Sequence, residues 1–246
     1  MNGISVIIPS KTATNLGPCL VAVRYYEPDC QIVIIDDGVD LNELRSKREW
    51  SGALEGCYLL AGKKPFNFAR NCNMGIRSAG QRDIVLLNDD ALMRSPEGFH
   101  VAQKAAEGDL DLGCIGATTN ITGQILQKPQ NQGLRIIHHI AFVCVFIPRR
   151  AINRLKEYQR IHPDTYRQQD GLLDERYCLD YGVEDRDYCE MLTRAGMKVA
   201  VHDKCYVDHS RLTSSYRGRP QAAGRSVQNR ALFLEKYKLG SYWKWN

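Results

Sequence analysis

DIVLLNDDA, residues Asp83–Ala91, is an apolar run that ends abruptly in three polar residues. A short apolar run with polar boundaries is typical of a strand buried on both faces, as in a parallel sheet. Ligands of open α/β sheets bind at the carboxyl ends of such strands. Asp89 and Asp90 therefore lie where a ligand site is expected, although Asn and Asp are also favoured in a solvated turn after a strand.

Two adjacent carboxylates repel each other unless a cation or hydrogen-bond donors compensate their charge. Mg²⁺ and Mn²⁺ prefer oxygen ligands and often bridge a protein to the phosphates of its substrate. A metal–diphosphate site at Asp89 and Asp90 is therefore the first functional hypothesis, and the solvated turn is its alternative.

The start of the chain predicts a strand, a helix and a second strand. Ile4–Pro9 is rich in β-branched residues, Leu16–Tyr25 has apolar residues at helical spacing, and Gln31–Ile35 is apolar again. This order is that of a βαβ unit with a right-handed crossover, which makes the two strands parallel. The second strand also ends in a carboxylate pair, Asp36-Asp37.

The rest of the chain continues the alternation of helices and strands. We expect helices over Leu41–Trp50, Phe66–Ala79, Pro96–Glu107, Pro148–Tyr158, Val183–Ala195 and Ser226–Lys238. We expect strands over Gly56–Leu60, Leu112–Ala117, Ile136–Ile147, Met197–Val201 and Cys205–Val207. This alternation predicts an α/β fold with a Rossmann-like, mostly parallel central sheet flanked by helices.

The composition is that of a globular protein. The 246 residues are 43% hydrophobic and 25% charged, and the net charge of +5 permits an anionic ligand without requiring nucleic acid. The nine cysteines are odd in number and form no CxxC pair, so we expect a reducing compartment, the cytoplasm. The strand near the N-terminus leaves no room for a signal peptide, and the apolar run Ile140–Pro148 is too short to span a membrane.

Three predicted strands end in groups that can bind a cation or a nucleotide. They are followed by Asp36-Asp37, Asp89-Asp90 and Asp208-His209. If the carboxyl ends of these strands lie at one edge of the sheet, the groups converge there. Each pair taken singly is weak evidence, and His209 taken alone fits an ordinary half-buried histidine better than a ligand.

A further acidic cluster occurs in YGVEDRDYCEML, where Glu184 and Asp185 begin a predicted helix and Asp187 follows. The helix dipole stabilises anions in a first turn, which is a purely structural explanation. The functional alternative is a general base that faces the same edge of the sheet.

Five segments in this order carry a resemblance to a known family: SVIIPS with QIVIIDDG, FNFARNCNMGI, LLNDDA, GLLDERYCLDYGVEDRDYCEMLTRAG and VDHS. The chain resembles the GT-A-fold nucleotide-sugar glycosyltransferases, especially the family 2 group, from about Ser5 to His209. LLNDDA lies where that family carries its Asp-x-Asp metal motif, with Asn88 at the first position.

The resemblance implies roles for five residues around the nucleotide. Asp37 would accept a hydrogen bond from the base or the ribose, while Pro9 and Ser10 would line the base pocket. Arg70 and Asn73 would face the ribose or the diphosphate.

The resemblance also implies the metal ligands and the catalytic groups. Asp90 and His209 would bind Mn²⁺ or Mg²⁺, and Asp89 would support the sugar or the ribose. Asp185 would be the catalytic base, and Glu184 would orient the acceptor or share that role.

The function implied is that of a metal-dependent, inverting glycosyltransferase. It would move a sugar from a nucleotide-diphosphate donor, a UDP-sugar first of all, to a hydroxyl of a saccharide or of another acceptor, a modified nucleic-acid base included. Residues 1–209 would form the GT-A domain, divided into a nucleotide-binding half, about 1–91, and an acceptor-binding half, about 92–209. Residues 210–246 would be a basic extension that packs on this single domain. The transmembrane tail of many relatives is missing.

Two other enzyme classes stay open. A nucleotidyltransferase also has an α/β nucleotide domain and paired carboxylates, but it would carry a glycine-rich phosphate loop, and SVIIPSKTATN contains no glycine. A retaining GT-A enzyme has a similar acidic motif and histidine.

A nucleic-acid-binding module without catalysis is the alternative from another class. From Lys204 to Asn246 there are nine Lys/Arg against two Asp/Glu. Aromatic residues are interleaved with these charges and could stack on single strands: Tyr216, Tyr237, Tyr242, Trp243 and Trp245.

Overall fold

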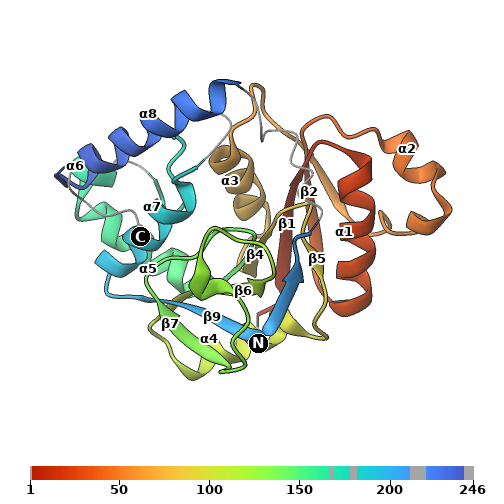
Figure 1. Ribbon diagram of the computed structural model, residues 1–246, viewed down its shortest axis with the longest axis horizontal. Helices are drawn as coiled ribbons and strands as arrows, with labels where there is room; N and C mark the ends of the chain where they lie inside the picture. The colour runs from red at the N-terminus through yellow and green to blue at the C-terminus, as the bar shows by residue number, and fades with distance from the viewer. Residues whose placement is uncertain (1, 167–168, 178–181, 211–219, 241–246) are drawn as a thin grey trace.

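A computed structural model describes the chain except residues 1, 167–168, 178–181, 211–219 and 241–246. It confirms the α/β class: a central, curled sheet lies between two layers of helices (Figure 1). The strands are β1 (Ile4–Ser10), β2 (Gln31–Asp36), β3 (Tyr58–Ala61), β4 (Asp83–Leu87), β5 (Leu92–Met93), β6 (Leu112–Thr119), β7 (Leu134–Ile137), β8 (Cys144–Ile147) and β9 (Lys198–Asp208).

The sheet has a parallel half and a mixed half. Its order is β3-β2-β1-β4-β8-β6-β9-β5, and β7 also pairs with β9. β3, β2, β1 and β4 are parallel neighbours, as the βαβ pattern predicts. β8 runs antiparallel to both β4 and β6, and β5 and β7 run antiparallel to β9, so parallel pairing dominates only in the first half.

The helices cover both faces of the sheet. They are α1 (Ala13–Tyr26), α2 (Leu41–Ser46), α3 (Phe68–Ser78), α4 (Gly98–Gly108), α5 (Arg149–Arg160), α6 (Pro163–Tyr166), α7 (Glu184–Arg194) and α8 (Pro220–Lys236), with 3₁₀ turns η1 (Arg48–Trp50) and η2 (Ile125–Gln127). Side chains of α1 and α4 belong to the core on one face, and those of α3, α5, α7 and α8 to the core on the other. None of the helices in the described ranges is long and apolar enough to cross a bilayer.

The stretch that organises the fold is the buried strand β4. All five of its residues are buried, with Val85 and Leu87 in one core and Ile84 and Leu86 in the other. Burial on both faces explains why this strand reads as a continuous apolar run rather than as an alternating one. Its carboxyl end delivers Asp89 and Asp90 to the edge of the sheet.

The predicted strand Ile136–Ile147 is wrong as a single element. It is two strands, β7 and β8, with an irregular segment between them. The cause is Gln127, whose buried amide accepts from the Ala141 backbone N–H at 2.9 Å and donates to its carbonyl at 3.0 Å. These backbone groups therefore do not join a sheet ladder, although the segment is apolar throughout.

Two other boundaries differ from the predictions. Met197–Val201 and Cys205–Val207 are parts of one strand, β9, whose pairing with β6 shifts register between Ala117 and Thr118. The shift admits the polar residues that suggested a break. Leu41–Trp50 is a short helix, α2, followed by the 3₁₀ turn η1, and not one helix.

The eight cysteines in the described ranges are free, and seven of them are buried. Cys144 in β8 and Cys189 in α7 both lie in the core, where a free thiol acts as a small apolar group.

Gly75 is required where α3 crosses β1. A Cβ at Gly75 would lie 2.4 Å from Cγ2 of the fully buried Ile7. We expect Gly75→Ala to lower the free energy of unfolding by about 1–3 kcal/mol, because overpacking outweighs the gain in helix propensity. Urea unfolding followed by circular dichroism measures this.

Gly108 in α4 is the matched control, because a Cβ there would meet nothing within 4 Å. Gly108→Ala should leave stability unchanged or raise it. Equal effects of the two substitutions would show that the α3–β1 contact has room for a methyl group.

Candidate active site at the carboxyl edge of the sheet

The two carboxylates after β2 have different partners. Asp36 Oδ1 accepts from the backbone N–H groups of Gly38 and Val39, at 2.8 and 2.7 Å, and so stabilises the turn. Asp37 is buried, and its Oδ1 lies 2.8 Å from Nζ of the exposed Lys64. Asp37 is thus the member of the pair that is held at the carboxyl edge with a charged partner.

Ser10 joins the ends of three adjacent strands. Its carbonyl accepts from the Asp37 N–H at 2.7 Å, and its hydroxyl donates to Asp89 Oδ2 at 2.6 Å. Because β1 lies between β2 and β4, a residue at its end can reach both neighbours. Ser10 is therefore part of a continuous polar edge from Asp37 to Asp89, and Pro9 precedes it in the strand.

Asp89 is held in an unusual environment for a carboxylate. Burial raises the pKa of Asp89 to about 6, against the hydrogen bond from Ser10, and the neighbouring Asp90 adds to the increase. The Asn15 amide lies 3.5 Å from Oδ1. A carboxylate with these neighbours gains from any positive charge or donor that approaches the edge.

Asp90 and His209 meet although 119 residues separate them. β5 pairs with the end of β9, Leu92 opposite Asp208, and this pairing brings the two segments together. His209 Nε2 lies 3.1 Å from Asp90 Oδ1, and both side chains are buried. The two residues that the sequence predicts as metal ligands are therefore neighbours.

The geometry of this pair suits a shared cation. His209 Nδ1 contacts the carbonyl of Ile121 at 3.0 Å, and because a carbonyl only accepts, Nδ1 carries the proton. In the neutral ring Nε2 then presents its lone pair beside a carboxylate oxygen. Two ligands at about 2.1 Å from one Mg²⁺, at right angles, are about 3 Å apart, which is close to the observed separation. The donor set fits a hard divalent cation.

Arg70 and Asn73 both bind neighbouring loops. The Asn73 amide is buried, accepts from the Leu173 N–H at 3.0 Å and donates to the Leu173 carbonyl at 2.9 Å. These bonds anchor the segment before α7, and the contact of Asn73 with ribose or diphosphate stays a prediction. Arg70 donates to the carbonyls of Lys63 and Pro65, which fixes the loop after β3.

The first turn of α7 holds the two predicted catalytic carboxylates in different environments. Glu184 is buried, and burial raises the pKa of Glu184 to about 7, with a further contribution from Asp185. The Asp185 side chain is 28% exposed, and its Oδ1 accepts from the Arg186 N–H at 2.7 Å. Asp185 is therefore the more accessible of the two carboxylates.

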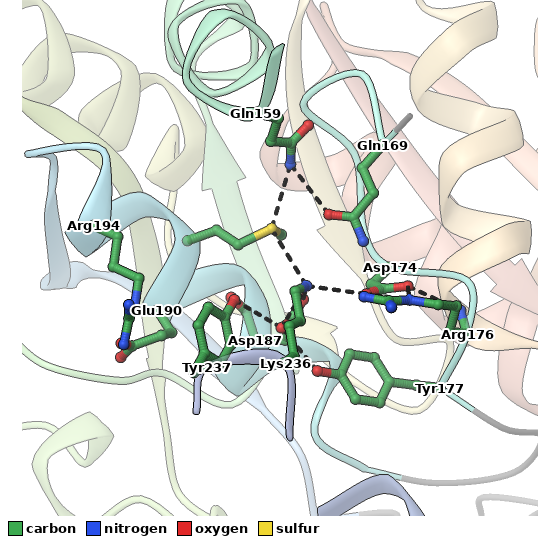
Figure 2. A network of polar contacts seen from close by, with 11 residues as sticks. Gln159, Gln169, Asp174, Arg176, Tyr177, Asp187, Glu190, Arg194, Lys236 and Tyr237 are labelled. Atoms are coloured by element: carbon green, nitrogen blue, oxygen red, sulfur yellow. Dashed lines mark hydrogen bonds and ion pairs between the residues drawn. The ribbon is translucent and has the colours of Figure 1, made fainter. Parts of the chain in front are cut away.

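A buried ionic network underlies this turn (Figure 2). Lys236 of α8, fully buried, lies between two carboxylates, 3.0 Å from Asp174 and 2.8 Å from Asp187. The hydroxyls of Tyr177 and Tyr237 donate to Asp187 Oδ1, each at 2.8 Å. Every charge in the group thus has a partner of opposite sign or a hydrogen-bond donor, as burial requires.

The pKa values of the two carboxylates diverge. Burial alone would raise the pKa of Asp174, but Arg176, bonded at 2.6 Å, and Lys236 outweigh it and lower the pKa to about 2. For Asp187 burial prevails and raises the pKa, against the opposing charge of Lys236. Asp174 is therefore the carboxylate of the two that stays ionised to lower pH.

This network determines where Asp185 points. Successive helical residues are 100° apart, so residues two positions apart project from nearly opposite sides. Asp187 is held inward by Lys236 and the tyrosines, so Asp185 projects away from the buried network. In the acidic motif, Asp187 is thus buried and bound, whereas Asp185 is accessible.

The described part of the C-terminal segment packs on α7. Phe233 is fully buried in the core, and the Asn229 amide donates to the Gly182 carbonyl, just before α7, at 2.9 Å. Tyr237 is also buried, so it is not available to stack on a nucleic acid. The other aromatic residues of that hypothesis, Tyr216, Tyr242, Trp243 and Trp245, lie outside the described residues.

Sequence reasoning missed several residues of this region. Lys236 is one of many basic residues near the C-terminus, and no local pattern marks it as buried. Asn120, whose Oδ1 accepts from the His209 N–H at 2.8 Å, lies in a polar loop without a recognisable motif. His139, whose Nε2 lies 3.7 Å from Asp185 Oδ1, falls in the segment that was predicted as a strand.

A second group of potential metal ligands lies elsewhere. Glu27, Cys30 and His100 bring their ligand atoms within 4.8 Å of one another at the amino end of β2, away from the carboxyl edge. Glu27 accepts from the Phe99 N–H at 2.7 Å and lies 3.0 Å from the His100 ring, and burial raises the pKa of the Cys30 thiol to about 12. The geometry is explained by Glu27 capping the start of α4.

Comparison with known proteins rests on structure, because no family model and no curated protein matches the sequence. GalNAc-T7 with UDP, GalNAc and Mn²⁺ aligns with 96% of this chain, at a TM-score of 0.69 and 14% identity. The chain has the GT-A fold. Two further glycosyltransferases with this fold are similar to it. The mannosyltransferase PcManGT from Pyrobaculum calidifontis, in complex with GDP-Man and Mn²⁺, aligns with 96% of the chain at a TM-score of 0.61 and 13% identity.

The third similar structure is S. aureus TarS 1-349, with a TM-score of 0.55, 13% identity and 84% of this chain covered. The chain spans only part of each of these proteins, 48% of the GalNAc-T7 chain, 60% of the TarS chain and 64% of the PcManGT chain. The expected fold is thus confirmed, and the chemistry has to be argued from the site.

Lys236 should be essential for stability. Lys236→Met leaves Asp174 and Asp187 without their shared cation, and we expect the free energy of unfolding to fall by about 3–5 kcal/mol. Urea unfolding monitored by fluorescence gives the value.

Lys238→Met provides the control, because Lys238 is exposed and lies on the same segment. Its effect should stay within about 0.5 kcal/mol, as is usual for surface substitutions. A similar, small effect of both changes would contradict the importance of the buried network.

Proposed function

We propose that this protein is a metal-dependent, inverting glycosyltransferase that moves a sugar from a UDP-sugar to a hydroxyl of a saccharide acceptor. The observation that carries the proposal is the buried pair Asp90–His209, 3.1 Å apart at the carboxyl edge of the sheet. Asp37, Ser10 and Asp89 extend that edge, and the GT-A fold is a fold of nucleotide-sugar transferases.

Asp90 and His209 would hold Mn²⁺ or Mg²⁺. Such a cation, when bound, offsets the negative charge that develops on the departing diphosphate. Two of the similar structures contain Mn²⁺, one with UDP and the other with GDP-Man. These two structures support a divalent cation and a nucleoside diphosphate at the same edge. A panel of nucleotides decides between uracil, guanine and the other nucleobases.

The protein groups around the donor have separate tasks. Asp37 would accept a hydrogen bond from the base or the ribose, with Pro9 and Ser10 beside it. Asp89, next to Asp90, would bind hydroxyl groups of the sugar or the ribose. Arg70 shapes the loop that borders this region through its bonds to Lys63 and Pro65.

Asp185 would act as the general base. Its carboxylate takes the proton of the acceptor hydroxyl while the hydroxyl oxygen bonds to the anomeric carbon, and the bond to the diphosphate oxygen breaks with its electron pair. A single displacement of this kind inverts the anomeric centre. Glu184, buried beside it with a raised pKa, would support the orientation of the acceptor.

The division of the chain follows from these roles. Residues 1–91 carry the groups assigned to the nucleotide, and residues 92–209 carry Asp185 and His209. The described part of the segment 210–246 packs on the proposed catalytic helix α7 and the residues before it through α8. The free cysteines of the described ranges suit a reducing compartment such as the cytoplasm.

The donor site is tested first by thermal shift with UDP, GDP, dTDP, CMP and their sugar conjugates, with and without Mn²⁺. A ligand at one hundred times its Kd stabilises the native state by about 2.7 kcal/mol. We expect stabilisation by UDP and UDP-sugars that depends on Mn²⁺ and is lost in Asp90→Asn.

Asp111→Asn is the control for that variant, because Asp111 is exposed and pairs with Arg154 at the surface. It should keep the full response to UDP and Mn²⁺. A metal-dependent response that survives in Asp90→Asn removes Asp90 from the metal site, and no response to any nucleotide in the wild type contradicts the proposed function.

Asp185→Asn should separate binding from catalysis. We expect kcat to fall roughly 10²- to 10⁴-fold, because the amide cannot accept the acceptor proton, while donor binding is unchanged. Steady-state transfer rates and the Mn²⁺-dependent thermal shift give the two quantities. Asp170→Asn, at an exposed position, serves as control, and near-normal turnover of Asp185→Asn would exclude Asp185 as the base.

A further inference from the structure

His139 lies beside the proposed base in an incomplete arrangement. Its Nε2 is 3.7 Å from Asp185 Oδ1, and its side chain is 11% exposed. Both ring nitrogens are inaccessible to solvent and lack a hydrogen-bond partner. A buried imidazole normally has its nitrogens paired, because each unpaired polar atom loses its hydration without compensation.

The segment that carries His139 is held in place by backbone hydrogen bonds at its middle and at its end. At its end, the Val143 carbonyl accepts from the Asn88 N–H at 2.9 Å, directly beside Asp89. In its middle, both backbone groups of Ala141 bind the amide of Gln127. The His139 imidazole therefore lies beside α7 on a segment that is also bound to the carboxyl edge of the sheet.

The Asp185 carboxylate has one oxygen engaged and one available. Oδ1 accepts from the Arg186 N–H at 2.7 Å and is the oxygen that His139 approaches. Across the described ranges no residue binds Oδ2. The separation of 3.7 Å exceeds a hydrogen bond, so a shift of less than one ångström is needed for the imidazole N–H to reach Oδ1.

We infer that His139 is a positioning residue for Asp185, an assignment that rests on the proposed function. Its Nε2–H donates to Oδ1 in the acceptor complex and turns Oδ2 toward the acceptor hydroxyl. The contact has two effects, because it pairs one of the two buried ring nitrogens and fixes the rotation of the carboxylate. A base that is held in one orientation avoids the loss of rate that misplacement causes.

The neighbouring His138 offers a matched comparison, since it is exposed and lies on the same segment. Three variants separate the roles. His139→Leu removes the N–H with little loss of volume, His139→Gln keeps a donor near the position of Nε2, and His138→Leu tests the segment itself.

Each variant is assayed for kcat, the KM values of donor and acceptor, and the Mn²⁺-dependent thermal shift with UDP. We expect His139→Leu to lower kcat roughly ten- to a hundredfold with unchanged donor KM and donor binding. His139→Gln should recover most of the rate, and His138→Leu should resemble the wild type. Equal rates of His139→Leu and His138→Leu would overturn the inference.

A double-mutant cycle shows whether His139 acts through Asp185. In the Asp185→Asn background, His139→Leu should cause no further loss of kcat. A full additional loss in that background would mean an independent role and would overturn the assignment.

Should His139→Leu not fold, His139→Gln is compared with His139 in the wild-type and Asp185→Asn backgrounds. A loss of kcat from His139→Gln that is equally large in both backgrounds contradicts the inference. A wild type without nucleotide binding or transfer would overturn the proposed function, and this inference with it.

Discussion

Removing a carboxylate from water is costly unless donors or an opposite charge accompany it, and this protein buries several carboxylates. Three of the carboxylates described above are matched by a group from a distant part of the chain: Asp89 by Ser10, Asp90 by His209, and Asp187 by Lys236. These matches hold the sheet edge, the end of β9 and the C-terminal helix in one arrangement. The contacts that compensate the buried charges are therefore the same contacts that form the candidate site.

The two groups of carboxylates differ in how completely positive charges and hydrogen-bond donors of the protein compensate their negative charge. The network around Lys236 is balanced, since its lysine and arginine face two carboxylates and both tyrosine hydroxyls donate. The edge around Asp89 and Asp90 has only neutral donors and one imidazole among the contacts described above. A balanced group stabilises the fold, whereas a group with excess negative charge favours a cationic ligand.

Much of the fold could be predicted from the sequence, because buried strands and amphipathic helices leave local patterns. The proximity of Asp90 and His209 was also expected, because the resemblance to GT-A glycosyltransferases implies that both residues bind one metal ion. Contacts between a side chain and a distant backbone leave no such pattern. Gln127 interrupts an apolar run that reads as a strand, and the bond between Asn73 and Leu173 joins residues that are 100 positions apart.

The position of Lys236 in the chain has a consequence for synthesis. Asp187 precedes its partner by 49 residues and Asp174 precedes it by 62. Because the ribosome makes the chain from its N-terminus, both acids emerge well before the cation that allows them to be buried. Until α8 arrives, Asp174 and Asp187 stay hydrated, and α7, which carries Asp187, cannot pack in its final place. The parallel half of the sheet can assemble during translation, whereas the packing of α7 is completed only after it.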